Sequence, residues 1–136
     1  MIYITRRERF SAAHKLERKE WSAEKNFEIF GKCSNPNWHG HNYVLHVTVK
    51  GEPSEETGFV ANLSDISKIL KEKVLNLVDH KNLNIDVQFM EGKLTSTENL
   101  AISIWDQIKS EIDKLNCELH CVKLQETENN SVEYFG

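Results

Sequence analysis

The sequence predicts a single α+β domain in which two helices cover one face of a four-stranded antiparallel sheet. Apolar and polar residues alternate in segments near both ends of the chain, as in half-buried strands, and apolar residues recur at helical spacing in the middle. The length of 136 residues fits one domain, residues 1–136. The resulting order ββααββ is typical of α+β folds.

Two strands are expected before the helices. Alternation over residues 2–9 predicts the first strand, which can continue as far as His14. Residues 42–51 alternate strictly, and the face that we expect to be buried carries Tyr43, Leu45, Val47 and Val49. The intervening residues 15–32 are charged and irregular and are predicted to form a long loop. A short strand over residues 58–61 is expected to follow.

Two helices are predicted in the middle of the chain. Apolar side chains recur every three or four positions over residues 64–78, and again from Leu100 to Leu115. The residues Thr95, Ser96, Thr97 and Glu98 directly precede the second helix and fit a capping box.

Two strands are expected to close the chain, over residues 119–126 and 131–135. Between them lie Asn129 and Asn130, which tolerate left-handed turn geometry. A sheet of four strands has two edges with unpaired backbone groups, and proteins usually cover such edges. Edge-to-edge assembly of subunits is one way to do so, and we therefore expect an oligomer.

The composition excludes several classes of protein. A formal net charge of −4 argues against a nucleic-acid or membrane-surface binder. No apolar run approaches the ~20 residues of a membrane-spanning helix, and the first ten residues are too charged for a signal peptide. The three cysteines have no disulfide-like spacing, so we expect a cytoplasmic protein with free thiols.

The densest chemical signal runs from Cys33 to His41. If the second strand starts near His39, then His39 and His41 share one face, and His14 ends the neighbouring strand. Three histidines around an open position would form a catalytic zinc site. A surface or hydrogen-bonded pair of histidines is the simpler interpretation of His-x-His alone. A closed structural zinc site would need a fourth ligand, and Cys33 is the local candidate.

Five further residues have a structural interpretation to weigh against a functional one. Cys33 is either a small buried residue or, near a cation, a reactive thiolate. Asp79 and His80 either end a helix or form a proton-transfer pair. Glu98 fits a capping residue, and Glu126 is either solvated or a bidentate acceptor for adjacent ring N–H groups.

Together these segments resemble the 6-pyruvoyltetrahydropterin synthase family. Six matching motifs occur in the family's order and span nearly the whole chain: residues 10–14 (FSAAH), 31–33 (GKC), 35–43 (NPNWHGHNY), 78–83 (VDHKNL), 96–99 (STEN) and 125–130 (QETENN). The resemblance implies the tunnelling fold, in which three subunits close their sheets into one β-barrel and two rings stack into a homohexamer. Active sites would then lie at subunit interfaces.

The resemblance also implies roles for individual residues. It makes zinc the cofactor and gives three residues as its ligands: His14, His39 and His41. Cys33 would be the general base, completed by Asp79 and His80. Glu126 would anchor the pterin ring, which Thr97 and Glu98 would also contact.

The implied reaction converts 7,8-dihydroneopterin triphosphate to 6-pyruvoyltetrahydropterin with loss of triphosphate and without a redox cofactor. An alternative branch makes 6-carboxytetrahydropterin and acetaldehyde, on the route to queuosine. Five residues separate Cys33 from His39, which resembles the pyruvoyl branch. A folate-linked branch has glutamate in place of Cys33. Trp38 and Asn62 depart from the glycine and aspartate of many relatives, and Trp38 can narrow the pocket. A pterin-binding module without turnover is the non-enzyme alternative.

Overall fold

The computed structural model describes residues 1–136 and contains one five-stranded sheet in the order β3-β1-β2-β4-β5. The strands are β1 (Ile2–His14), β2 (His39–Gly51), β3 (Lys81–Asn82), β4 (Glu118–Thr127) and β5 (Asn130–Tyr134). Antiparallel pairing joins β1, β2, β4 and β5, which confirms the four predicted strands. The short β3 runs parallel to β1, so the predicted purely antiparallel sheet of four strands was wrong.

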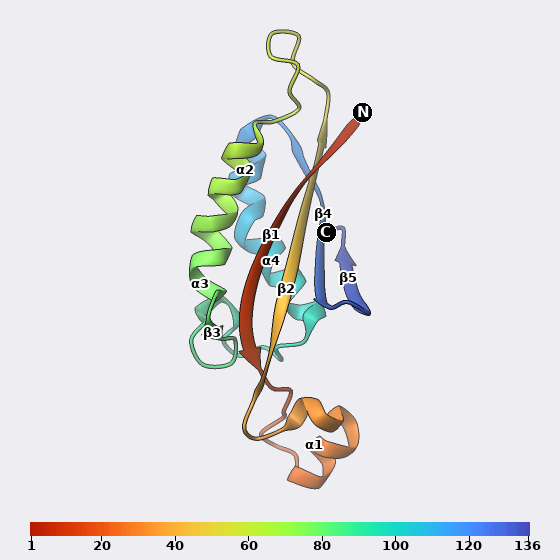
Figure 1. Cartoon of the computed structure of the whole chain (residues 1–136), viewed down its shortest axis with the longest axis vertical. Coiled ribbons are helices and arrows are strands. Elements are labelled where there is room, and N and C mark those ends of the chain that lie inside the picture. Colours follow the sequence, from red (N-terminus) through yellow and green to blue (C-terminus); the bar gives the residue numbers. More distant parts are fainter.

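Helices cover one face of this sheet (Figure 1). The first predicted helix is present as α2 (Leu63–Leu70), a π-helical turn (Lys71–Leu75) and α3 (Asn76–Val78). The second is α4 (Thr97–Ile112). Short 3₁₀ turns occur at Gly31–Ser34, Gln88–Met90 and Asp113–Leu115. No helix is both long enough and apolar enough to cross a membrane.

The region predicted as a loop contains a further helix, α1 (Ala23–Phe30), which lies beyond the end of the sheet (Figure 1). Ser22 caps it by accepting a hydrogen bond from the Lys25 N–H. The buried Asn26 side chain accepts a hydrogen bond from the Arg18 N–H and donates one to the Arg18 carbonyl oxygen. Only Asn26 is buried in α1, so the helix buries no apolar face within the chain.

Two smaller expectations were also wrong. Residues 58–61 form no strand; Gly58 has a φ of 74° and belongs to the turn that follows β2. Ser96 rather than Thr95 caps α4, because its Oγ accepts from the Asn99 N–H. Asn129 and Asn130 do not use the left-handed geometry that they tolerate; positive φ angles outside glycine occur at Trp38, His80 and Asn116.

The alternating face of β2 carries the core. Tyr43, Leu45, Val47 and Val49 are all fully buried, which confirms the predicted face. Their alternation continues towards the start of the strand, where His41 and His39 share the same face. The helix-covered face therefore ends in histidines at the end of the sheet nearest α1 (Figure 1).

Candidate active site

The three predicted ligand histidines meet at the junction of β1 and β2. The antiparallel register pairs His14 with His39, and His41 lies two residues further along the same face of β2. One ring nitrogen from each histidine lies within 4.8 Å of the others. Small rotations of the rings would bring such nitrogens around one zinc ion at about 2.0–2.1 Å.

The hydrogen bonds of the cluster suit a metal ion. His14 Nδ1 lies 2.7 Å from the Thr95 carbonyl oxygen, which can only accept, so Nδ1 carries the proton and Nε2 keeps a lone pair. His14 Nε2, His41 Nε2 and both ring nitrogens of His39 are buried without a hydrogen-bond partner. Buried polar atoms normally have partners, and a bound cation would supply one for each of these rings.

Burial also keeps two of these rings neutral. Desolvation lowers the pKa of His14 most strongly; the contact with Thr95 opposes this, and the neighbouring His39 and His41 add to it. Burial likewise lowers the pKa of His39, helped by His41. Neutral imidazole is the form that binds a metal ion, so the electrostatics agree with the geometry.

A carboxylate faces the histidine cluster. Glu126, near the end of β4, places Oε1 3.8 Å from His41 Nε2 and Oε2 4.0 Å from His14 Nε2. Thr97, the first residue of α4, donates a hydrogen bond from Oγ1 to Oε2 of this carboxylate. One strand and one helix N-terminus thus fix a half-buried acceptor beside the cluster, and Oε1 stays available to a ligand.

A cavity of about 510 Å³ opens beside the cluster and brings together five of the predicted site residues: His14, Cys33, Thr97, Glu98 and Glu126. Cys33 lies in the 3₁₀ turn after α1 and is half-buried. Its carbonyl oxygen accepts a hydrogen bond from the Leu16 N–H at 2.7 Å, which ties this turn to the end of β1. A thiol, a carboxylate and one histidine of the cluster therefore line one cavity.

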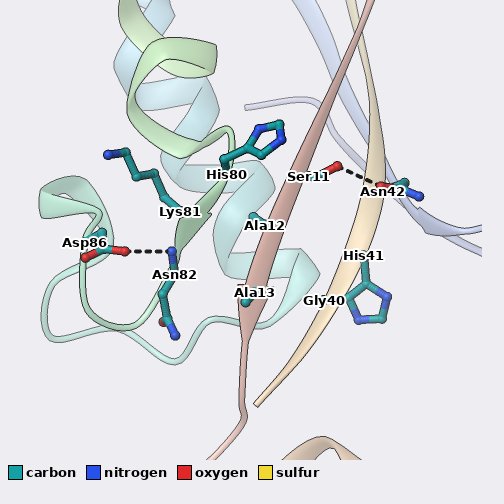
Figure 2. Close-up of a pocket in the computed structure, with 10 residues that line it drawn as sticks. All are labelled: Ser11, Ala12, Ala13, Gly40, His41, Asn42, His80, Lys81, Asn82 and Asp86. Carbon is teal, nitrogen blue, oxygen red and sulfur yellow. Dashed lines mark hydrogen bonds between the residues drawn. The ribbon is translucent and has the colours of Figure 1, made fainter. Parts of the chain in front are cut away.

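Asp79 and His80 do not reach this cavity within one chain. His80 lines a different pocket of about 510 Å³, shown in Figure 2, where its ring points outward from the segment beside β1. Its Nδ1 lies 3.1 Å from Asp79 Oδ1, and its side chain is 83% exposed. Asp79 Oδ1 also accepts from the Ser11 N–H, and this bond, followed by those to His80, lowers the pKa of the carboxyl.

The sequence pattern placed Tyr43 in the core but not in the site. Its ring centroid lies 5.6 Å from that of His41 and 6.3 Å from that of His14, and its hydroxyl is buried without a partner. Burial raises the pKa of the phenol, and the nearby Glu126 and Cys33 raise it further. The sequence did contain one signal that Tyr43 lies near the site: it follows His41 by two residues and therefore shares its face of β2.

Comparisons with known proteins agree with this arrangement. The sequence model of the family described as 6-pyruvoyl tetrahydropterin synthase matches residues 3–136. A 6-pyruvoyl tetrahydrobiopterin synthase from Dictyostelium discoideum is 48% identical over 99% of this chain and 96% of that protein. A 6-carboxy-5,6,7,8-tetrahydropterin synthase from Bacillus subtilis is 32% identical over 84% of this chain and 70% of that protein.

Among solved structures, the 6-pyruvoyl tetrahydropterin synthase of Caenorhabditis elegans superposes with a TM-score of 0.91. It is 38% identical and the match covers 99% of this chain and 95% of that one. The similarity thus extends over the whole sheet, its helices and the histidine-lined end. The chain belongs to the 6-pyruvoyl tetrahydropterin synthase family.

Proposed function

We propose that this protein is a zinc-dependent lyase that converts 7,8-dihydroneopterin triphosphate to 6-pyruvoyltetrahydropterin with loss of triphosphate. The observation that carries the proposal is a cavity lined by Cys33, Glu126 and His14, which is one member of a three-histidine cluster. A structural zinc domain would have closed the site with a fourth ligand. Here the cluster borders an open cavity that a small molecule can enter.

His14, His39 and His41 would hold the zinc ion. Bound there, the ion would supply Lewis acidity to the hydroxyl groups of the substrate side chain. The Thr95 carbonyl orients His14 through Nδ1, as a partner beyond the ligands does in many metal sites. Loss of any of the three rings would leave two ligands, so each ring contributes to retention of the ion.

Cys33 would be the general base and Glu126 the pterin anchor. As a thiolate, Cys33 would take a proton from a side-chain carbon, after which triphosphate leaves and hydrogen is redistributed from the side chain to the ring. Glu126 would accept hydrogen bonds from the adjacent N–H groups of the pterin ring. Thr97 already holds one oxygen of this carboxylate, and Glu98 lines the same cavity.

Asp79 and His80 would act on the cavity of a neighbouring subunit. In one chain they lie beside β1, apart from Cys33, and His80 is exposed. β3 covers β1 only at Ala12 and Ala13, so most of one sheet edge is open, and β5 forms the other edge. Pairing of these edges in a barrel of three subunits, stacked as a homohexamer, would cover both.

The pyruvoyl product is favoured over the carboxy product for two reasons. The similarity to a relative named for the pyruvoyl reaction is 48%, against 32% for a relative named for the carboxy reaction. Five residues separate Cys33 from His39, the spacing that resembles the pyruvoyl branch. The deazapurine (queuosine) route therefore remains the alternative, and a cytoplasmic location is expected for either.

A product assay tests the proposal. The zinc-loaded protein is incubated with 7,8-dihydroneopterin triphosphate, the pterin product is identified by mass, and acetaldehyde is assayed in parallel. We expect 6-pyruvoyltetrahydropterin and no acetaldehyde. A carboxy product with acetaldehyde would transfer the chain to the other branch. Zinc binding without turnover would support the pterin-binding module instead.

A further inference from the structure

We propose that a second cavity, next to the catalytic one, is a binding site for a polyphosphate anion. This cavity measures about 540 Å³. Alternate residues from the end of β1 onward line the two cavities: His14 and Leu16 border the catalytic cavity, and Lys15 and Glu17 border the second. We call the second cavity the cationic cleft, after Lys15, Arg18, Lys19 and Lys93 in its wall.

The cationic cleft carries an excess of positive charge in a protein whose formal net charge is −4. Its four cations face two carboxylates, Glu17 and Glu20. Only Lys15 has an ion pair, 3.4 Å from Glu17. The other three cations have no carboxylate within ion-pair distance, so the cleft offers charge that the folded chain itself does not neutralise.

Trp38 forms one wall of the cleft at a conformational cost. Its φ of 68° lies in the left-handed region, which a bulky side chain rarely occupies. The Lys15 ammonium lies 4.4 Å from the centre of the Trp38 ring, a cation–π contact, and the Lys15 side chain is only 14% exposed. A strained aromatic residue that holds a half-buried cation at a cavity is the kind of outlier found at binding sites.

Lys93 adds positive charge to the cleft from a second segment of the chain. It follows Gly92, whose φ of 76° lets the chain turn there. Its ammonium donates a hydrogen bond at 2.9 Å to Oγ of Ser103, a residue only 1% exposed in α4. The serine hydroxyl is neutral, so it positions the ammonium without cancelling its charge.

A polyphosphate fits this arrangement better than a single carboxylate does. The cations come from separate segments, at Lys15, at Arg18 and Lys19, and at Lys93, so one anion must present several charges in a row to engage them. Phosphate oxygens accept hydrogen bonds from both kinds of cation. The lysine ammonium acts as a compact point charge, and the planar arginine guanidinium can donate two parallel hydrogen bonds. The polyphosphate can be the substrate's tail, which rests on the function proposed above, or a free nucleoside triphosphate.

Direct titration with inorganic tripolyphosphate, followed by calorimetry, tests the site without requiring turnover. Lys93→Ala and Arg18→Ala should each weaken binding about tenfold at low salt, which corresponds to the loss of one charge-assisted hydrogen bond. Lys109→Ala is the matched control, because Lys109 lies on α4 and pairs with Asp113 outside the cleft. His39→Ala should still bind tripolyphosphate, which separates the cleft from capture by the metal ion.

Two further measurements distinguish the triphosphate tail of the substrate from a free nucleoside triphosphate. If the anion is the substrate's tail, Lys93→Ala should raise KM for the triphosphate substrate with little change in kcat, and tripolyphosphate should inhibit competitively. If it is a free nucleotide, ATP should bind as tightly as tripolyphosphate while KM stays unchanged. Either result supports the site. Wild-type protein that binds neither anion, or binding that Lys93→Ala and Arg18→Ala leave at the level of Lys109→Ala, would overturn it.

Discussion

His14 donates a hydrogen bond from Nδ1 to the carbonyl oxygen of Thr95 at 2.7 Å. The bond joins the last residue of β1 to the residue that precedes the Ser96 cap of α4. It fixes the tautomer of His14, so that Nε2 faces His39 and His41. The backbone just before α4 thereby orients one proposed ligand, and the same helix start positions Thr97 against Glu126.

The histidine cluster should account for the bound metal. Replacing His39 with alanine leaves two rings, and we expect metal content to fall from about one ion per chain to near zero by elemental analysis. His46→Asn is the control, because His46 lies on the same strand but on the opposite face. Equal metal loss in both variants would mean that the ion lies elsewhere.

The stability of the metal-free protein should fall as the pH drops below about 6.5. Burial lowers the pKa of His14 from its ordinary value of 6.5. The unfolded chain therefore binds a proton near this pH that the folded chain does not, so protonation favours unfolding. Urea unfolding in the presence of a chelator, at pH 7.5 and 5.5, measures the difference.

The comparison variant for this pH effect is His14→Gln, which cannot take up the proton. It should show a smaller loss of unfolding free energy between the two pH values than the wild-type chain does. A wild-type stability that is constant, or that rises on acidification, would contradict the assigned direction of the shift.

Tyr43→Phe should not destabilise the metal-free, ligand-free protein. The Tyr43 hydroxyl is fully buried without a partner, so its removal breaks no hydrogen bond and relieves the cost of burying a polar group. We expect a change in unfolding free energy between zero and a gain of about 1 kcal/mol. A loss of more than about 1 kcal/mol in urea unfolding would show that the hydroxyl has a partner in the folded chain.

Mixed oligomers should recover activity from two inactive variants. Cys33→Ala removes the proposed base of a chain's own cavity, and His80→Gln removes the group proposed to act in a neighbour's cavity. After unfolding and refolding together, some sites would contain an intact Cys33 and an intact His80 from different chains. We expect turnover to return in the mixture, while each variant refolded alone stays inactive. No recovery would place both residues in one chain's site.

Periodicity predicted most of the fold because the core follows it. Strict alternation identified the buried face of β2, and helical spacing identified the segment that ends at Val78 and the body of α4. It could not reveal α1, where Asn26 is the one buried residue, or β3, which is two residues long. The cap at Ser22 and the tertiary hydrogen bonds of Asn26 hold α1 in place, and neither follows from a buried apolar face.

The site was predictable only in part. Strand alternation placed His39 and His41 on one face, but nothing in the spacing showed that His14 meets them; the pairing of β1 with β2 does. The resemblance implied a triad of Cys33, Asp79 and His80, yet in one chain Cys33 and His80 line separate pockets. A residue that acts across a subunit interface is invisible to any pattern within one chain.

The most direct test of the proposed catalytic centre is to measure zinc content and turnover on the same preparation of Cys33→Ala. Cys117→Ser is the control, because Cys117 is half-buried just before β4 and lies outside the catalytic cavity. We expect Cys33→Ala to keep its zinc and lose conversion of 7,8-dihydroneopterin triphosphate, while Cys117→Ser keeps both. Zinc lost together with the thiol would make Cys33 a ligand and would contradict its role as the base.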